Sequence, residues 1–195
     1  PEAAAEMAAA VAEANPDAAG EVASMMMEAN PEGAADLAAA MAEANPEAAA
    51  AVASAVVQTI PDQASDIANA MVEANPEAAQ GAAEGMIEAN PEAALEIATS
   101  MAEANPEAAG DIAAGMAESA PGAAVEVASA MAESNPDIAG DVAGGVALNA
   151  PQVAAATAGS IAEDSPELAG DIAAGVAEAA PAMAGIVVAD LVESN

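Results

Sequence analysis

Carboxylates are the only chemically active side chains that this 195-residue sequence holds in quantity. The chain has 33 aspartate and glutamate residues and no lysine, arginine, histidine or cysteine, so its formal net charge is −33. Rows of carboxylate oxygens are ligands for hard cations such as Ca²⁺. The calcium-loop pattern D-x-[DN]-x-[DN]-G does not occur. We therefore expect no cofactor and no defined metal site, only weak binding of Ca²⁺ or another divalent cation.

The same composition argues against several classes of protein. Paired carboxylates can act as general acid and base, but only in unequal environments, and repeated exposed glutamates offer equal ones. Because histidine and cysteine are also missing, the usual catalytic bases, nucleophiles and transition-metal ligands are absent, and we expect no enzyme. A chain without basic residues cannot neutralise phosphates, so we expect no nucleic-acid partner. Every apolar stretch ends well before the roughly 20 residues of a membrane span, so we expect no membrane insertion.

The acidic residues follow a strict period that shows which elements must position them. Prolines recur every fifteen residues from Pro1 to Pro181 and divide the chain into 13 equal units. Thirty of the 33 acidic residues lie at positions 2, 6 and 13 of these units. At 100° per residue, these positions fall on one side of a helix. We expect a solvated acidic face on every unit.

Each unit has the start and stop signals of one short helix of about twelve or thirteen residues. Proline is favoured at the first helical position, and the asparagine before it is suited to cap the helix with its side-chain oxygen. Position 4 is alanine in every unit, and positions 7 and 11 carry larger apolar residues, such as Met7 with Val11 and Ile67 with Met71. Such i,i+4 pairs predict a buried stripe. The capping asparagines are Asn15, Asn30, Asn45, Asn75, Asn90, Asn105 and Asn135.

Short helices joined by very short links predict an all-α fold, an α-solenoid of 13 helices with 15 residues each, paired as 30-residue antiparallel hairpins. Residues 1–195 then form a single continuous repeat array, which we expect to be part of a longer array or assembly. Glycines at positions 5 and 10 recur at 30-residue spacing in the C-terminal half, which predicts two alternating kinds of helix for an inner and an outer layer. They are Gly110, Gly115, Gly140, Gly145, Gly170 and Gly175.

The methionines at position 11 fit core filling better than an adaptable binding groove. They are Met26, Met41, Met71, Met86, Met101, Met116 and Met131. The run Met25–Met27 cannot point wholly inward, so we expect one or two of its side chains at a helix contact or on the surface.

The last unit, PAMAGIVVADLVESN, is the most apolar of all, whereas solenoids usually end in polar capping repeats. Its apolar residues spread over more than one helix face, so we expect them to form an assembly contact. They are Met183, Ile186, Val187, Val188, Leu191 and Val192. The first unit likewise has no polar cap. The expected partner is another copy of the chain, in a homo-oligomer or filament.

These features predict a structural repeat protein that forms a fibre, stalk or spacer and assembles end to end. We expect it outside the cell or at the cell surface, because a chain without lysine and arginine offers no cleavage site to trypsin-like proteases. The alternative is a solenoid binding module for a peptide, a polymer or divalent cations. Against that alternative, the sequence has none of the aromatic and arginine residues that dominate binding faces.

Overall fold

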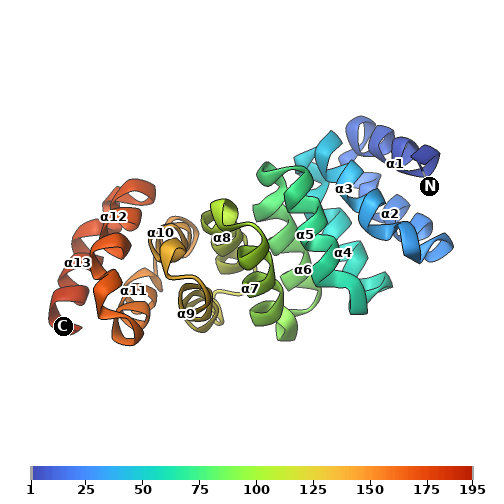
Figure 1. Ribbon diagram of the computed structural model, residues 1–195. Coiled ribbons are helices and arrows are strands. Elements are labelled where there is room, and N and C mark those ends of the chain that lie inside the picture. Colours follow the sequence, from blue (N-terminus) through green and yellow to red (C-terminus); the bar gives the residue numbers. More distant parts are fainter. Residues whose placement is uncertain (1, 195) are drawn as a thin grey trace.

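The chain folds into an elongated stack of short helices with its two ends at opposite ends of the stack (Figure 1). The computed structural model describes residues 2–194, and Pro1 and Asn195 lie outside this range. No strand occurs in residues 2–194, and each fifteen-residue unit contributes one α-helix. This is the predicted α-solenoid.

Helices two units apart pack side by side, so the odd-numbered and even-numbered helices form two layers. The odd layer consists of α1 (Glu2–Ala14), α3 (Ala34–Ala44), α5 (Ala64–Ala74), α7 (Ala94–Ala104), α9 (Ala124–Ser134), α11 (Ala154–Asp164) and α13 (Pro181–Ser194). The even layer consists of α2 (Pro16–Ala29), α4 (Ala49–Thr59), α6 (Ala79–Ala89), α8 (Ala109–Ser119), α10 (Ala139–Asn149) and α12 (Ala169–Ala179). Each odd–even pair is one 30-residue hairpin, as predicted.

Most units begin with one turn of 3₁₀-helix that starts at the proline and leads into an α-helix of 11 residues. Proline fits here because its missing N–H would have no partner in the first turn. The 3₁₀ turns are η1 (Pro31–Gly33), η2 (Pro46–Ala48), η3 (Pro61–Gln63), η4 (Pro76–Ala78), η5 (Pro91–Ala93), η6 (Pro106–Ala108), η7 (Pro136–Ile138) and η8 (Pro166–Leu168). Apart from the turns at residues 121–123 and 151–153, only the residue before each proline lies outside a helix, which keeps the links short.

The core is a continuous band of apolar side chains between the two layers of helices. Positions 4, 7 and 11, where the sequence predicts the buried stripe, are buried in both layers from α3 to α11, and so is position 8. Met41, Met71, Met86, Met101, Met116 and Met131 are all fully buried. Of the methionine run, Met27 is fully buried, Met26 is partly buried and Met25 is 62% exposed, which confirms that the run does not point wholly inward. Alanine at most other core positions keeps this band thin.

The predicted asparagine caps form only where an odd helix leads into an even one. The side-chain oxygens of Asn45 and Asn75 accept hydrogen bonds from the N–H groups of Glu47 and Glu77, both at 3.0 Å. Asn135 accepts one from Asp137 N at 3.2 Å. Asn15, Asn30, Asn90 and Asn105 make no side-chain cap, so the prediction is wrong for these four residues.

The two forming caps in the N-terminal half also connect neighbouring hairpins. Asn45 Nδ2 donates to the carbonyl oxygen of Ala12 at 2.9 Å, and Asn75 Nδ2 donates to that of Ala42 at 3.0 Å. Each acceptor lies near the C-terminal end of the preceding odd helix, where carbonyls lack partners within the helix. One amide therefore satisfies two helix ends.

Candidate interaction surfaces

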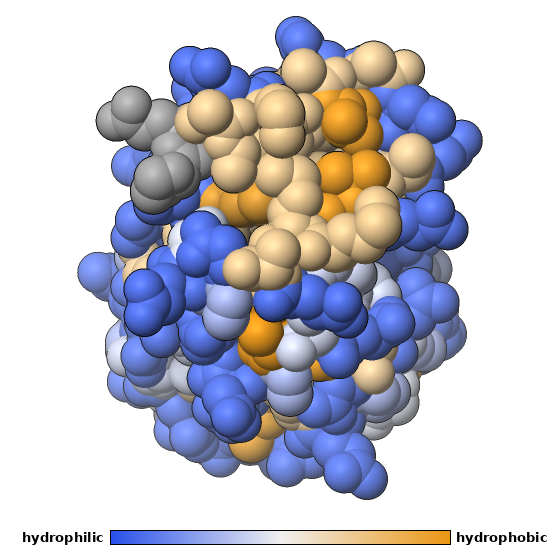
Figure 2. Space-filling model, turned by 90° about the vertical axis from the view of Figure 1, so that its right-hand side faces the viewer, coloured by the Kyte–Doolittle hydropathy of each residue, from blue (hydrophilic) through white to orange (hydrophobic). Residues whose placement is uncertain are grey.

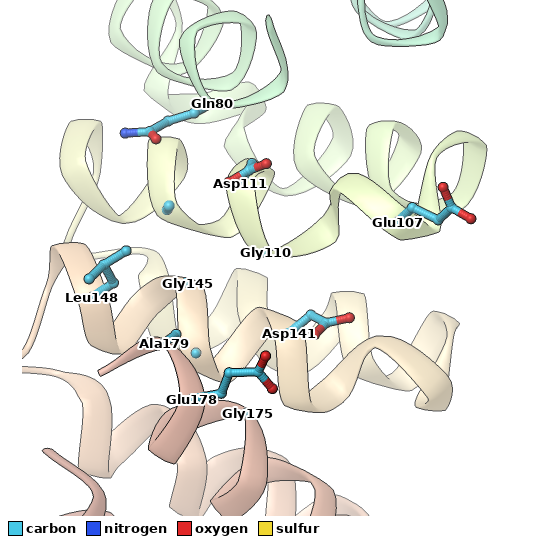
Figure 3. A pocket seen from close by; sticks show the side chains of 12 residues that line it. Gln80, Glu107, Gly110, Asp111, Asp141, Gly145, Leu148, Gly175, Glu178 and Ala179 are labelled. Atoms are coloured by element: carbon cyan, nitrogen blue, oxygen red, sulfur yellow. The ribbon is translucent and has the colours of Figure 1, made fainter. Parts of the chain in front are cut away.

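The even layer carries a hollow floored by glycine backbone, which we call the glycine groove. It has a volume of about 280 Å³ and runs across α8, α10 and α12 (Figure 3). The floor is formed by Gly110, Gly144, Gly145 and Gly175. Carboxylates line it, and they come from successive even units, among them Asp111, Asp141 and Glu178. Leu148, at 58% exposure, is its one large apolar side chain.

The glycines have a packing role that is independent of any ligand. A Cβ atom built on Gly145 would lie 2.1 Å from the carbonyl oxygen of Gly110, and one on Gly175 would lie 2.0 Å from that of Gly140. Gly85 and Gly115 show the same relation to Ala50 and Gln80, at 2.0 and 2.2 Å. Position 10 of an even helix therefore rests directly on the backbone at position 5 of the even helix before it.

The groove offers a cationic ligand the negative charge of its carboxylates. In residues 2–194, no group of three or more acidic residues is placed to hold a metal ion. Weak divalent binding thus remains a prediction without a defined site.

The carboxyl group of Glu84 is partly buried on α6. Partial burial raises the pKa of its carboxyl group above the ordinary value, and the charges of Glu118 and Glu88 raise it further. Glu84 stands at position 9, a position with no other acidic residue. Our sequence analysis missed this residue, although an acidic side chain four residues before Glu88 on one helix is a readable signal of like-charge repulsion.

The predicted assembly residues lie at the C-terminal end of the array, on α13. Ile186, Val188 and Val192 are exposed, at 56%, 42% and 73%. Met183 is partly buried, and Val187 and Leu191 are buried, so three of the six residues already pack mainly against the array.

A hollow of about 390 Å³ lies between α12 and α13, lined by Ala169, Gly170, Ala173, Val188, Leu191 and Val192. We call these residues, together with Ile186, the C-terminal end face. It is apolar throughout. No internal even helix leaves its position-5 glycine uncovered, but no atom lies within 4 Å of a Cβ built on Gly170.

The N-terminal end is apolar as well. Met7 is 62% exposed, so its predicted place on the buried stripe is wrong, because no earlier helix covers α1. Met25 on α2 is equally exposed. We call Met7, Ala10 and Met25, with the apolar residues around them, the N-terminal end face. Figure 2 shows this end, where apolar side chains gather in one patch bordered by hydrophilic residues.

No protein-family model matches the chain, and neither a curated protein nor a solved structure is significantly similar to it. No helix in residues 2–194 is long and apolar enough to cross a membrane. The class that the fold itself defines is a tandem-repeat α-solenoid.

Proposed function

We propose that this chain is a non-enzymatic structural protein whose copies join end to end into a fibre, stalk or spacer. The observation that carries the proposal is the distribution of polarity along the array. Five of the seven large apolar side chains that are exposed in the described residues lie on the two end faces, and the other two are Leu95 and Leu148. The units between the end faces present acidic residues to solvent at positions 2, 6 and 13.

This distribution favours growth along one axis. The two end faces differ in sequence and shape, so their contact is head to tail and leaves a free face at each end, as in an open filament. The sides carry carboxylates and no basic residue, so two arrays that approach sideways repel each other. Two arrays of the same net charge also repel each other when they meet end to end, and salt lowers this repulsion, since the screening length falls from about 30 Å at 10 mM to about 8 Å at 150 mM.

The proposal is tested by sedimentation and negative-stain microscopy of the full chain across about a hundredfold range of concentration, at about 10 and 150 mM salt. We expect particles of constant width whose length grows with concentration and with salt. Single arrays at every concentration and at both salt levels would refute the proposal. Particles that grow in width would also contradict it, because they would show lateral association.

We place this function outside the cell or at the cell surface. The support is chemical: the chain contains no lysine or arginine, so it would withstand trypsin-like proteases even when unfolded. Incubation with trypsin at a temperature that unfolds the helices should leave the chain intact.

The glycine groove supports a second candidate function, a binding module for a cationic peptide or polymer or for divalent cations. Its carboxylates from successive even units match the charge of such ligands. Calorimetric titration with an oligolysine peptide, spermine or CaCl₂ tests this candidate. Binding of oligolysine that Leu148→Glu strengthens and Asp141→Asn weakens would support a site in the groove. Equal binding by both variants would indicate only a diffuse counterion cloud.

A further inference from the structure

We propose a specific seating for the contact between two copies: α1 of one copy packs on α12 of the other, and α2 packs on α13. This inference rests on the proposed end-to-end assembly. The partner of the C-terminal end face is then the N-terminal helix pair of a second copy of this chain. The arrangement repeats between two chains the way in which each helix pair packs on the preceding pair within one chain.

The packing within the array supplies the template. In the even layer, position 10 of each helix from α6 to α12 meets the position-5 carbonyl of the even helix before it. A position-5 glycine also meets the carbonyl at position 6 of the next even helix, as Gly140 does with Asp171. Each position 5 therefore fits between positions 6 and 10 of the helix that follows.

The C-terminal end face has two position-5 residues on which no following helix packs. We call the site that a position-5 residue offers to the next helix a seat. Gly170 is position 5 of α12 and Gly185 is position 5 of α13. A Cβ on either residue would have no other atom within 4 Å. The equivalent residues Gly110 and Gly140 are both covered by the next even helix. The open seats continue an interface that is already built several times inside the chain.

The size of the residue at position 10 decides which helix takes which seat. Position 10 is Ala10 in α1 and Met25 in α2. Glycine stands at position 10 of the four even helices α6, α8, α10 and α12, and the backbone of the preceding even helix leaves no space there for even a Cβ atom. A methionine at position 10 therefore cannot pack on Gly170 in that geometry. An alanine can, because α4, which packs on Gly20 of α2 through Ala51, carries Ala55 at position 10. α1 therefore belongs on α12.

The same seating brings Met25 to the odd layer, where the helices pack less closely. α7 and α9 carry Leu95 and Val125 at position 5, and glycine never occupies position 10 there. Gly185 has no side chain at this point, so the long side chain of Met25 has room on α13. Met7 then enters the hollow between α12 and α13, at the position that is buried in helices such as α5 and α7.

Engineered cysteines test the seating, because the chain has none of its own. Two single variants are mixed in each experiment and oxidised, and covalent dimers are measured. Disulfides need Cα atoms about 4.4–6.8 Å apart, so only residues in backbone contact should join. We expect Ala10→Cys to join Gly170→Cys and Met25→Cys to join Gly185→Cys. Efficient joining of Met25→Cys to Gly170→Cys, with none of Ala10→Cys, would overturn the seating.

A steric variant checks the same contact without chemistry. Gly170→Leu fills the seat in open space, so it should leave the melting temperature of the single array unchanged or slightly raised and weaken association at least tenfold. Gly122→Leu is the matched control, since Gly122 is equally open but lies on the side of the array, before α9. It should associate like the unmodified chain.

The outcomes separate this inference from the proposed function. Filaments that form in the unmodified chain, with no joining of the expected cysteine pairs and no effect of Gly170→Leu, would refute the seating and leave the structural function in place. A chain that stays a single array under all conditions would refute both.

Discussion

The even and odd layers are built from the same fifteen-residue unit, yet they pack in different ways. In the even layer from α4 to α12, backbone lies directly against backbone, and position 10 is glycine in α6, α8, α10 and α12. In the odd layer, positions 9 and 10 carry polar side chains that bond between neighbouring helices. Asn69 Nδ2 donates to Ser100 Oγ at 3.2 Å, and Ser129 Oγ bonds Ser160 Oγ at 2.8 Å.

The difference between the layers grows along the chain. Near the N-terminus, both layers carry small residues at position 5, such as Ala5 in the odd layer and Gly20 in the even layer, and their helices pack about equally closely. From α5 onward the odd helices pack less closely, and α7 and α9 carry the larger Leu95 and Val125 at position 5. One repeat unit thus yields two kinds of layer through changes at only two or three positions.

The largest expected effect tests whether the two layers share one core. Met101→Ala in α7 and Met116→Ala in α8 each remove a fully buried side chain. Each should lower the free energy of unfolding by about 2–5 kcal/mol, and the two losses should be similar. Urea unfolding followed by circular dichroism measures them, with the exposed Met25→Ala as the control. A small loss for one layer alone would mean that the layers do not share a core.

The next effect probes the backbone contact in the even layer. Gly145→Ala places a Cβ against the carbonyl of Gly110, and such overpacking costs about 1–3 kcal/mol. In an exposed helix the same change would stabilise by up to about 1 kcal/mol. Ala130→Ser, at position 10 of the odd helix α9, should stay within about 0.5 kcal/mol. A raised melting temperature for Gly145→Ala would show that the even helices do not touch as described.

A smaller effect separates the two kinds of link between the layers. Asn75→Ala removes a cap and the bond to Ala42, so it should cost about 1–2 kcal/mol. Asn90 makes no side-chain cap, so Asn90→Ala should cost less than about 0.5 kcal/mol. Thermal unfolding of the two variants side by side provides the measurement. Equal losses would contradict the assignment of capping to the odd-to-even links.

The smallest effect concerns charge in the even layer. The native pKa of Glu84 is raised, so the native state holds its proton to higher pH than the unfolded state does. The contribution of Glu84 to stability therefore falls as pH rises from the ordinary carboxyl pKa through the raised native value. Glu84→Gln should raise the melting temperature slightly at neutral pH and lose this gain in acid.

Glu43→Gln is the control for this variant, because it removes the same charge from an exposed site in α3. An equal gain from both variants would show that Glu84 contributes only to the general repulsion among the 33 acidic residues.

Much of the fold follows from the sequence because every unit repeats the same signals. Proline fixes each helix start, and the apolar positions 4, 7, 8 and 11 fix the buried face. The 30-residue glycine pattern marks the even layer. The exposure of Met7 did not follow, because a position rule holds only where both neighbouring helices are present. The bonds from Asn45 and Asn75 to a carbonyl 33 residues earlier in the chain did not follow either, because they form only when neighbouring hairpins pack together.

The candidate surfaces were predictable to a lesser degree. The apolar character of the last unit identified Ile186, Val188 and Val192, which are exposed. Burial of Val187 and Leu191 depends on how α13 packs on its neighbours, which its own sequence does not reveal. The glycine groove was missed, because its lining residues come from four units that meet only in the folded array.

The backbone contacts in the even layer also have a mechanical consequence. Helices that touch through main-chain atoms cannot be compressed further, whereas the odd layer from α5 onward has side chains that can rearrange. The array should therefore resist bending that shortens the even side and yield to bending that shortens the odd side. The bending stiffness of the array should therefore depend on the direction of the bend.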